Sequence, residues 1–117
     1  MVAIVDDDPS MLSAAKNLLE AHGFASKNYS SAEEFLGDLS THQFDCLLLD
    51  IHLGGLSGIG LQQQLKSSHP TLPVIFMTAL DDDAVRQQAL QTGCAACLNK
   101  PFLAHQLLDA IEKACRT

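Results

Sequence analysis

One short stretch limits the possible folds of this chain more than any other: an apolar run, Cys46-Leu47-Leu48-Leu49, that ends directly in the carboxylate of Asp50. A glycine-rich, turn-prone segment follows it. An apolar run this short, bounded by turn residues, favours a strand that is buried on both faces. In a parallel α/β sheet the carboxyl ends of the strands open onto the ligand crevice. Asp50 is therefore expected at the mouth of such a crevice, unless it serves only as a turn-former that caps the next segment.

Length and charge narrow the class of protein. With 117 residues, 47% of them hydrophobic, the chain is long enough for one packed domain, expected over residues 1–117. The net charge of -7 argues against direct binding of nucleic acid or of an anionic membrane, since both need a basic face. The N-terminal apolar run ends at Asp6 and lacks the basic lead of a signal peptide, so a cytoplasmic location is expected.

The order of apolar runs and amphipathic segments predicts five repeats of strand then helix. The expected strands cover residues 2–5, 24–29, 46–50, 74–77 and 95–98; the expected helices cover 9–22, 31–40, 58–68, 81–93 and 103–115. Such alternation with short connections implies a doubly wound α/β domain with a parallel sheet and helices on both faces. For five strands the flavodoxin-like order 2-1-3-4-5 is the natural expectation, and the polar second strand suits an edge.

Two helices carry more specific signals. The segment from Ser31 to Glu34 matches a capping box, in which a serine is followed three residues later by a glutamate. In the fourth helix the apolar residues Ala84, Val85, Ala89 and Leu90 are expected to form the face turned toward the sheet.

The predicted topology places the ends of the first and third strands side by side, so Asp6, Asp7 and Asp50 should converge. Clustered carboxylates either take up a proton or bind a cation, and hard oxygen ligands without Cys or His favour Mg²⁺. Thr78 closes the fourth strand and Lys100 lies near the end of the fifth. The edge of the sheet at which these strands end, the rim, would thus present three carboxylates, a hydroxyl and an ammonium.

These groups are the parts of a phosphoryl-transfer site. A carboxylate can act as nucleophile, while a metal ion, an ammonium and a hydroxyl neutralise the oxygens of the moving group. Each residue also has a plainer interpretation: Asp6 to Asp8 as an acidic helix cap, Thr78 as an ordinary strand end, and Lys100 as a solvated surface charge. Their joint occurrence at four strand ends, in this order, favours the site.

The motifs that carry this pattern resemble the receiver domain of bacterial two-component response regulators over essentially the whole chain. They are Val5-Asp6-Asp7-Asp8-Pro9, Leu49-Asp50 with Gly58 downstream, Met77-Thr78-Ala79 and Lys100-Pro101-Phe102. The segment 29–36 looks most like receivers that precede a helix-turn-helix DNA-binding domain. The resemblance therefore implies a role in transcriptional control through a domain that lies outside this chain, with a stand-alone receiver as the alternative.

The resemblance also implies a role for each rim residue. Asp50 would be the phospho-acceptor, Asp7 would bind Mg²⁺ directly, and Asp6 would help through water. The backbone carbonyl of His52 would be the third protein ligand, and Thr78 and Lys100 would contact the phosphoryl oxygens. The donor would be a phosphohistidine on a sensor histidine kinase. Phosphorylation would change partner binding or homodimerisation at the face formed by the fourth helix, fifth strand and fifth helix.

Two positions depart from the family pattern. The usual proline four residues after the acceptor is Gly54 here, which implies a looser loop. The usual tyrosine or phenylalanine three residues before the lysine is Cys97, which is too small to make the same inward swing. The phosphorylation chemistry should survive this change, but the relay to the output face must then run through another side chain or be driven differently.

Two other functions compete with this one. A receiver-like module regulated by binding alone would fit Cys97 but would leave the intact set of Asp, Thr and Lys without a purpose. A phosphatase with an aspartyl-phosphate intermediate typically carries a second Asp two residues after the nucleophile, to act as acid and base. His52 occupies that position here, and the chain has no segment for a substrate-covering cap. We therefore expect a phospho-acceptor that assists its own phosphorylation and dephosphorylation.

Overall fold

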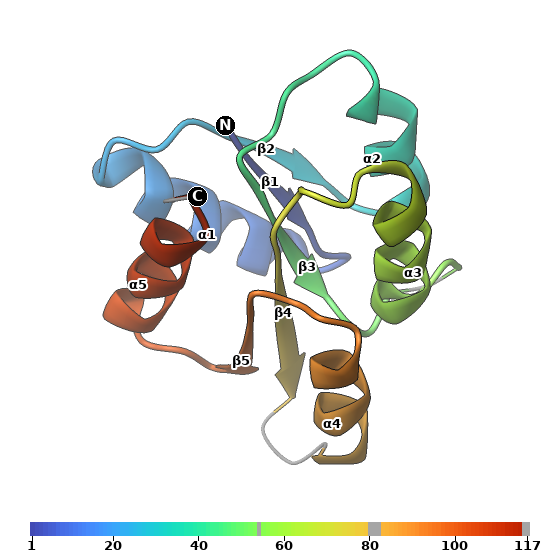
Figure 1. The fold of residues 1–117 in the computed structure, drawn as a ribbon. Coiled ribbons are helices and arrows are strands. Elements are labelled where there is room, and N and C mark those ends of the chain that lie inside the picture. The colour runs from blue at the N-terminus through green and yellow to red at the C-terminus, as the bar shows by residue number, and fades with distance from the viewer. Residues whose placement is uncertain (54, 80–82, 116–117) are drawn as a thin grey trace.

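The computed structural model describes residues 1–53, 55–79 and 83–115 and shows five strands alternating with five helices (Figure 1). The elements in chain order are β1 Val2–Val5, α1 Pro9–Ala21, β2 Ser26–Tyr29, α2 Ala32–Leu39, β3 Cys46–Asp50, α3 Gly58–Ser68, β4 Val74–Ala79, α4 Asp83–Gln91, β5 Ala96–Lys100 and α5 Ala104–Cys115. None of the helices in these described ranges is long and apolar enough to cross a membrane.

The sheet has the predicted topology. Its strands lie in the order β2-β1-β3-β4-β5 and all neighbouring pairs are parallel. Helices α1 and α5 cover one face, and α2, α3 and α4 cover the other (Figure 1). β2 lies at an edge, as its polar composition predicts. The flavodoxin-like arrangement brings the carboxyl ends of β1 and β3 together at the centre of the sheet, where the chain reverses its direction of winding.

The run from Cys46 to Leu49 is buried on both sides, as predicted for a central strand. Leu47 and Leu49 pack into the core beneath α2, α3 and α4, while Cys46 and Leu48 pack into the core beneath α1 and α5. All four side chains are fully buried. Complete burial of one leucine stabilises a fold by about 1.5–3 kcal/mol, so this strand fixes the position of Asp50 through both cores.

The N-cap residues of α1 and α2 stabilise the turns that lead from β1 and β2 into these helices. Asp8 caps α1 by accepting a 2.9 Å hydrogen bond from the amide of Ser10, and Pro9 occupies the first helical turn. Ser31 caps α2 by accepting a 3.1 Å bond from the amide of Glu34. Only half of the predicted capping box forms, because the Glu34 carboxylate accepts a hydrogen bond from the Ser30 hydroxyl.

The prediction for the inner face of α4 is wrong at two of its four positions. Ala89 is buried and Val85 is half-buried, but Ala84 is exposed and the Leu90 side chain is 47% exposed. The cause is the position of the helix beside an edge strand: all of β5 is only half-buried, so the sheet margin offers α4 a narrow contact. The predicted start of this helix at residues 81 and 82 falls outside the described residues.

Candidate functional site

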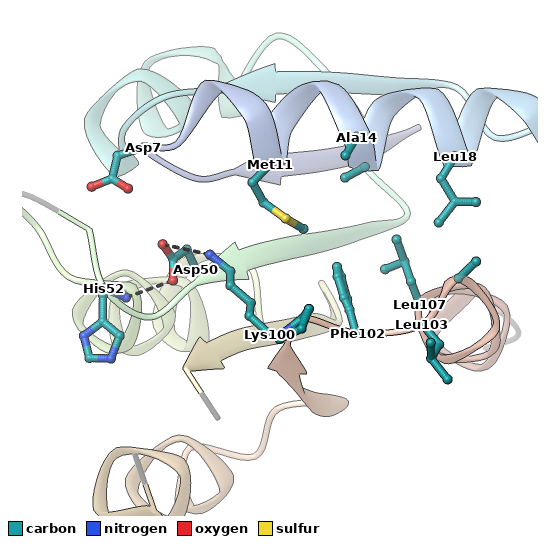
Figure 2. Close-up of a pocket in the computed structure, with 13 residues that line it drawn as sticks. Asp7, Met11, Ala14, Leu18, Asp50, His52, Lys100, Phe102, Leu103 and Leu107 are labelled. Carbon is teal, nitrogen blue, oxygen red and sulfur yellow. Dashed lines mark hydrogen bonds and ion pairs between the residues drawn. The ribbon is translucent and has the colours of Figure 1, made fainter. Parts of the chain in front are cut away.

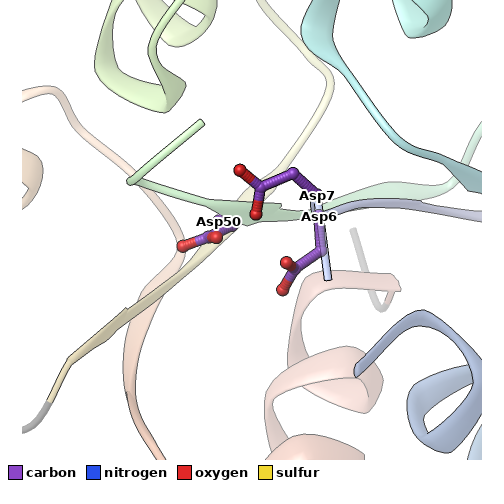
Figure 3. Close-up of side chains that lie close together, drawn as sticks. All are labelled: Asp6, Asp7 and Asp50. Atoms are coloured by element: carbon purple, nitrogen blue, oxygen red, sulfur yellow. The ribbon is translucent and has the colours of Figure 1, made fainter. Parts of the chain in front are cut away.

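Three carboxylates meet where β1 and β3 end (Figure 3). Val5 pairs with Leu49 across the two strands, so Asp6 and Asp7 leave β1 beside Asp50, the last residue of β3. One oxygen from each carboxylate lies within 4.8 Å of the others. Asp6 and Asp50 are buried and Asp7 is exposed. The predicted convergence of residues that are distant in sequence is confirmed.

Lys100 reaches this cluster from the end of β5. Its Nζ donates a 2.8 Å hydrogen bond to Oδ2 of Asp6 and lies 3.4 Å from Oδ2 of Asp50, as drawn for the Asp50 pair in Figure 2. The ammonium therefore lies between two carboxylates, one of them fully buried. One cation offsets part of the charge of three anions, so the cluster keeps a net negative charge that favours a bound cation.

The environment shifts the pKa of both Asp50 and Lys100. Burial and then the negative charge of Asp6 raise the pKa of Asp50 above its ordinary range, while Lys100 and the amide of His52 oppose that rise. For Lys100, burial lowers the pKa, but the hydrogen bond to Asp6 and the charge of Asp50 outweigh it and raise the pKa overall. The fold therefore disfavours the charged form of Asp50 and favours the charged form of Lys100.

Thr78 presents an unused hydroxyl at the same rim. It follows Met77, which pairs with Asp50 across β3 and β4. The residue is fully buried, and its Oγ1 finds no hydrogen-bond partner among the described residues. A buried hydroxyl without a partner costs about 1–3 kcal/mol, so the Thr78 hydroxyl is free to donate to an acceptor that a ligand brings.

The loop after β3 donates a backbone hydrogen bond to the Asp50 carboxylate. The amide of His52 donates a 3.2 Å hydrogen bond to Oδ1 of Asp50. The amide of Gly58 donates to the carbonyl of Ile51, at 3.1 Å, where α3 begins. A Cβ atom at Gly58 would lie 2.4 Å from the backbone oxygen of Asp50, so only glycine permits this close approach. Gly54, the position that departs from the family pattern, lies outside the described residues.

The structure adds a groove that sequence reasoning missed. It runs from Asp50 and Lys100 between α1 and α5 and has a volume of about 790 Å³. Figure 2 shows Met11, Ala14 and Leu18 of α1 facing Phe102, Leu103 and Leu107 across it. Met11 and Leu18 also pack against the core beneath α1 and α5, and only the relative position of the two helices reveals that they line an open surface.

Cys97 lies on β5 beneath α4, half-buried against the core. Burial raises the pKa of its thiol, and the nearby charge of Arg86 opposes that rise. The Arg86 guanidinium crosses from α4 to donate a hydrogen bond to Oδ1 of Asn99 on β5. A polar contact between α4 and β5 therefore lies next to the position where the family has an aromatic ring.

Replacing Asp50 by asparagine should stabilise the protein when no divalent cation is present. The substitution removes a buried negative charge beside Asp6 and keeps the shape, and such changes at strained sites commonly gain about 0.5–2 kcal/mol. The folded protein binds the Asp50 proton more tightly than the unfolded chain does. The gain should therefore be largest near neutral pH and should shrink as the pH falls and the wild-type carboxyl protonates.

Urea unfolding in a chelator at neutral and acidic pH measures this gain in stability. Asp109→Asn, on the exposed surface of α5, is the control, and equal effects of the two variants would contradict the account.

The fold and the rim together define a flavodoxin-like domain with an acidic site at the ends of β1 and β3. Comparison with known families identifies the domain more closely, because residues 2–112 match the model of the response regulator receiver domain. The chain belongs to this family. Such a domain is a phospho-acceptor and not an enzyme that turns over a separate substrate, and it implies a partner histidine kinase.

Curated relatives point the same way. The chain is 33% identical over 116 residues to the response regulator protein TodT of Pseudomonas putida, covering 99% of this chain and 51% of TodT. It is 31% identical over 115 residues to the transcriptional regulatory protein FixJ of Bradyrhizobium diazoefficiens, covering 98% of this chain and 56% of FixJ. The chain thus spans about half the length of these relatives.

Solved structures confirm the fold. The receiver domain of NtrX from Brucella abortus is 26% identical and superposes with a TM-score of 0.95, over 100% of this chain and 99% of that one. The BeF3-activated DrrB receiver domain is 28% identical, with a TM-score of 0.89, over 99% of this chain and 97% of that one. The acidic cluster at Asp6, Asp7 and Asp50 is typical of the cation site of receiver domains.

Proposed function

We propose that this receiver accepts a phosphoryl group on Asp50, from a phosphohistidine of a sensor histidine kinase, in a reaction that needs Mg²⁺. One observation carries the proposal: a buried carboxylate with a raised pKa lies beside two more carboxylates and an ammonium, and the neighbouring strand β4 holds a buried hydroxyl that has no partner among the described residues. This combination suits a group that carries several negative oxygens and arrives together with a cation.

The chemistry is a displacement at phosphorus. A carboxylate oxygen of Asp50 attacks, the bond between phosphorus and the donor imidazole nitrogen breaks, and an acyl phosphate forms on the aspartate. Lys100 can turn its ammonium from Asp50 to a phosphoryl oxygen, since its second bond to Asp6 keeps it at the rim. The Thr78 hydroxyl donates to another oxygen and so gains a partner, which it lacks among the residues that the structure describes.

The carboxylates of Asp6, Asp7 and Asp50 fit Mg²⁺, which takes oxygen ligands and usually keeps several waters. In this proposal Asp7 and Asp50 bind the ion directly, Asp6 acts through water, and the His52 carbonyl is the third protein ligand. The ion supplies charge neutralisation at the phosphoryl oxygens. The bond between Asp6 and Lys100 gives Asp6 a second task, which is to orient the ammonium.

The groove between α1 and α5 is the surface on which we place the donor. The donor imidazole must come close to Asp50, and the groove begins at that residue and continues along apolar side chains of both helices. Leu103 at its border is 63% exposed, which suits contact with another protein. An apolar helix of the kinase would cover the groove while its phosphohistidine meets Asp50.

For the output we propose a change in partner binding or homodimerisation at the face of α4, β5 and α5, and control of transcription through a domain outside this chain. The exposed Leu90 of α4 and the Arg86–Asn99 contact support a role for this face. Relatives named as transcriptional regulators, among them FixJ, support the proposed control of transcription. Because Cys97 replaces the aromatic ring, we assign the relay to the contact between α4 and β5.

The output proposal is tested by sedimentation of the protein with Mg²⁺ and beryllofluoride, a stable mimic of the phosphoryl group. Leu90→Glu should prevent the dimer that the wild type forms on activation, since it buries a charge at the proposed contact. Leu103→Glu adds the same charge at the groove and should leave dimerisation unchanged. A dimer that resists Leu90→Glu but not Leu103→Glu would move the interface to the groove.

The phosphorylation proposal is tested by intact-mass spectrometry after incubation with acetyl phosphate. We expect one phosphoryl adduct with Mg²⁺ and none in a chelator. No adduct with any small-molecule donor or kinase would favour the module regulated by binding alone. Steady turnover of a generic phosphate ester would favour the phosphatase.

A further inference from the structure

The side chain of Glu33, in the first turn of α2, reaches the loop that follows Asp50. Its Oε2 accepts a 3.0 Å hydrogen bond from the backbone amide of Leu56, 23 residues further along the chain. The same carboxylate lies against Gly55, because a Cβ atom there would be 3.0 Å from Oε2. Gly55 has a φ of 72°, a conformation that favours glycine.

Backbone hydrogen bonds also hold the two ends of this loop. Its start is held by the bond between the His52 amide and Asp50, and its end by the bond between the Gly58 amide and the Ile51 carbonyl. Between them the sequence has two adjacent glycines, Gly54 and Gly55, which raise the entropy lost when the loop is ordered. The Leu56 side chain packs on the core, and Glu33 holds the backbone of the same residue.

We propose that Glu33 is a positioning residue for the cation site. Through its bond to the Leu56 amide it holds the loop in the conformation in which the His52 carbonyl is available as a ligand. This inference rests on the proposed function, since it concerns the metal ligand on that loop. It assigns to α2 a task in the chemistry of Asp50 although α2 contributes no side chain to the rim.

The test compares Mg²⁺ binding, by isothermal titration calorimetry, in three variants. Glu33→Ala removes the hydrogen bond and should raise the dissociation constant by about 3- to 10-fold, the usual effect of one such bond. Glu33→Gln removes the charge but keeps an oxygen that accepts from the Leu56 amide, so it should stay within about twofold of wild type. Glu34→Ala removes the same charge from the same helical turn and should also leave binding unchanged.

A second readout tests the bond itself. Hydrogen exchange of the Leu56 amide should accelerate in Glu33→Ala, and in neither of the other two variants, with the same midpoint of urea unfolding throughout. Equal weakening of Mg²⁺ binding in Glu33→Gln and Glu33→Ala would show a charge effect and overturn the proposal. Unchanged Mg²⁺ binding in Glu33→Ala would also overturn this role of Glu33. It would leave the proposed phosphorylation of Asp50 intact, because the wild-type protein would still form the phosphoryl adduct. Wild-type protein that binds no Mg²⁺ would instead overturn the proposed function and, with it, this role of Glu33.

Discussion

Lys100→Met should slow formation of the phosphoryl adduct by about 100-fold or more. Removal of one charged donor from a site of developing negative charge typically costs a factor of about 100–1000. The Lys100 ammonium lies between Asp6 and Asp50, and no other Lys or Arg is recorded within ion-pair distance of either carboxylate in the described part of the chain. The rate of adduct formation from acetyl phosphate, followed by intact mass, measures the loss. Lys113→Met, in the exposed last turn of α5, removes the same charge and should react at the wild-type rate.

The same variant should also be less stable in a chelator, because Asp6 is fully buried and would lose its cation. The Lys100 side chain is 27% exposed, which reduces the expected loss to about 2 kcal/mol, below the 3–5 kcal/mol of a fully buried pair. Added Mg²⁺ should restore part of it, since binding to the folded state alone stabilises that state. A Lys100→Met protein with wild-type stability and no response to Mg²⁺ would contradict the charge balance described for the rim.

Gly58→Ala should destabilise the fold by about 3 kcal/mol, at the upper end for overpacking. The added methyl group would meet the backbone oxygen of Asp50 at 2.4 Å and the Cα of Ile51 at 2.8 Å. Both are backbone atoms, so the strain can be relieved only by moving the start of α3 or the backbone at Asp50 and Ile51. We therefore expect weaker Mg²⁺ binding together with the loss of stability.

Gly37→Ala is the matched control for this substitution. Gly37 lies inside α2, and a Cβ atom there would have no neighbour within 4 Å. Alanine at a helical position is favoured over glycine by about 0.8–1 kcal/mol, so this variant should be more stable than wild type. Urea unfolding of both variants measures the two shifts. A neutral Gly58→Ala would mean that α3 can move away from Asp50 without cost.

Much of this architecture is predictable because its causes are local. The apolar run before Asp50 and the glycine-rich segment after it are enough to predict a central strand, and the strand–helix alternation then favours the order 2-1-3-4-5 for the sheet. Once the order is known, the convergence of Asp6, Asp7 and Asp50 follows from the rule that parallel strands end at one edge. Thr78 and Lys100 join the site by the same rule.

The contacts that could not be predicted join elements through single side chains. The bond from Glu33 to the Leu56 amide has no sequence signature, because its acceptor lies in a helix start and its donor is a backbone group in a loop. The hydrogen bond from the Arg86 guanidinium to Asn99 depends on how closely α4 approaches β5. The exposure of Leu90 has the same origin, since periodicity identifies an apolar stripe but not how much sheet is available to cover it.

Identification of the phosphorylated residue tests the central claim most directly. Borohydride reduces an acyl phosphate on aspartate to homoserine, so treatment of the adduct followed by peptide mass spectrometry marks the acceptor. We predict homoserine at position 50 in the wild type and no labelled residue in Asp50→Asn. Homoserine at Asp6 or Asp7 in the wild type, or a phosphoryl group on a residue other than aspartate, would contradict the assignment of Asp50 as the acceptor.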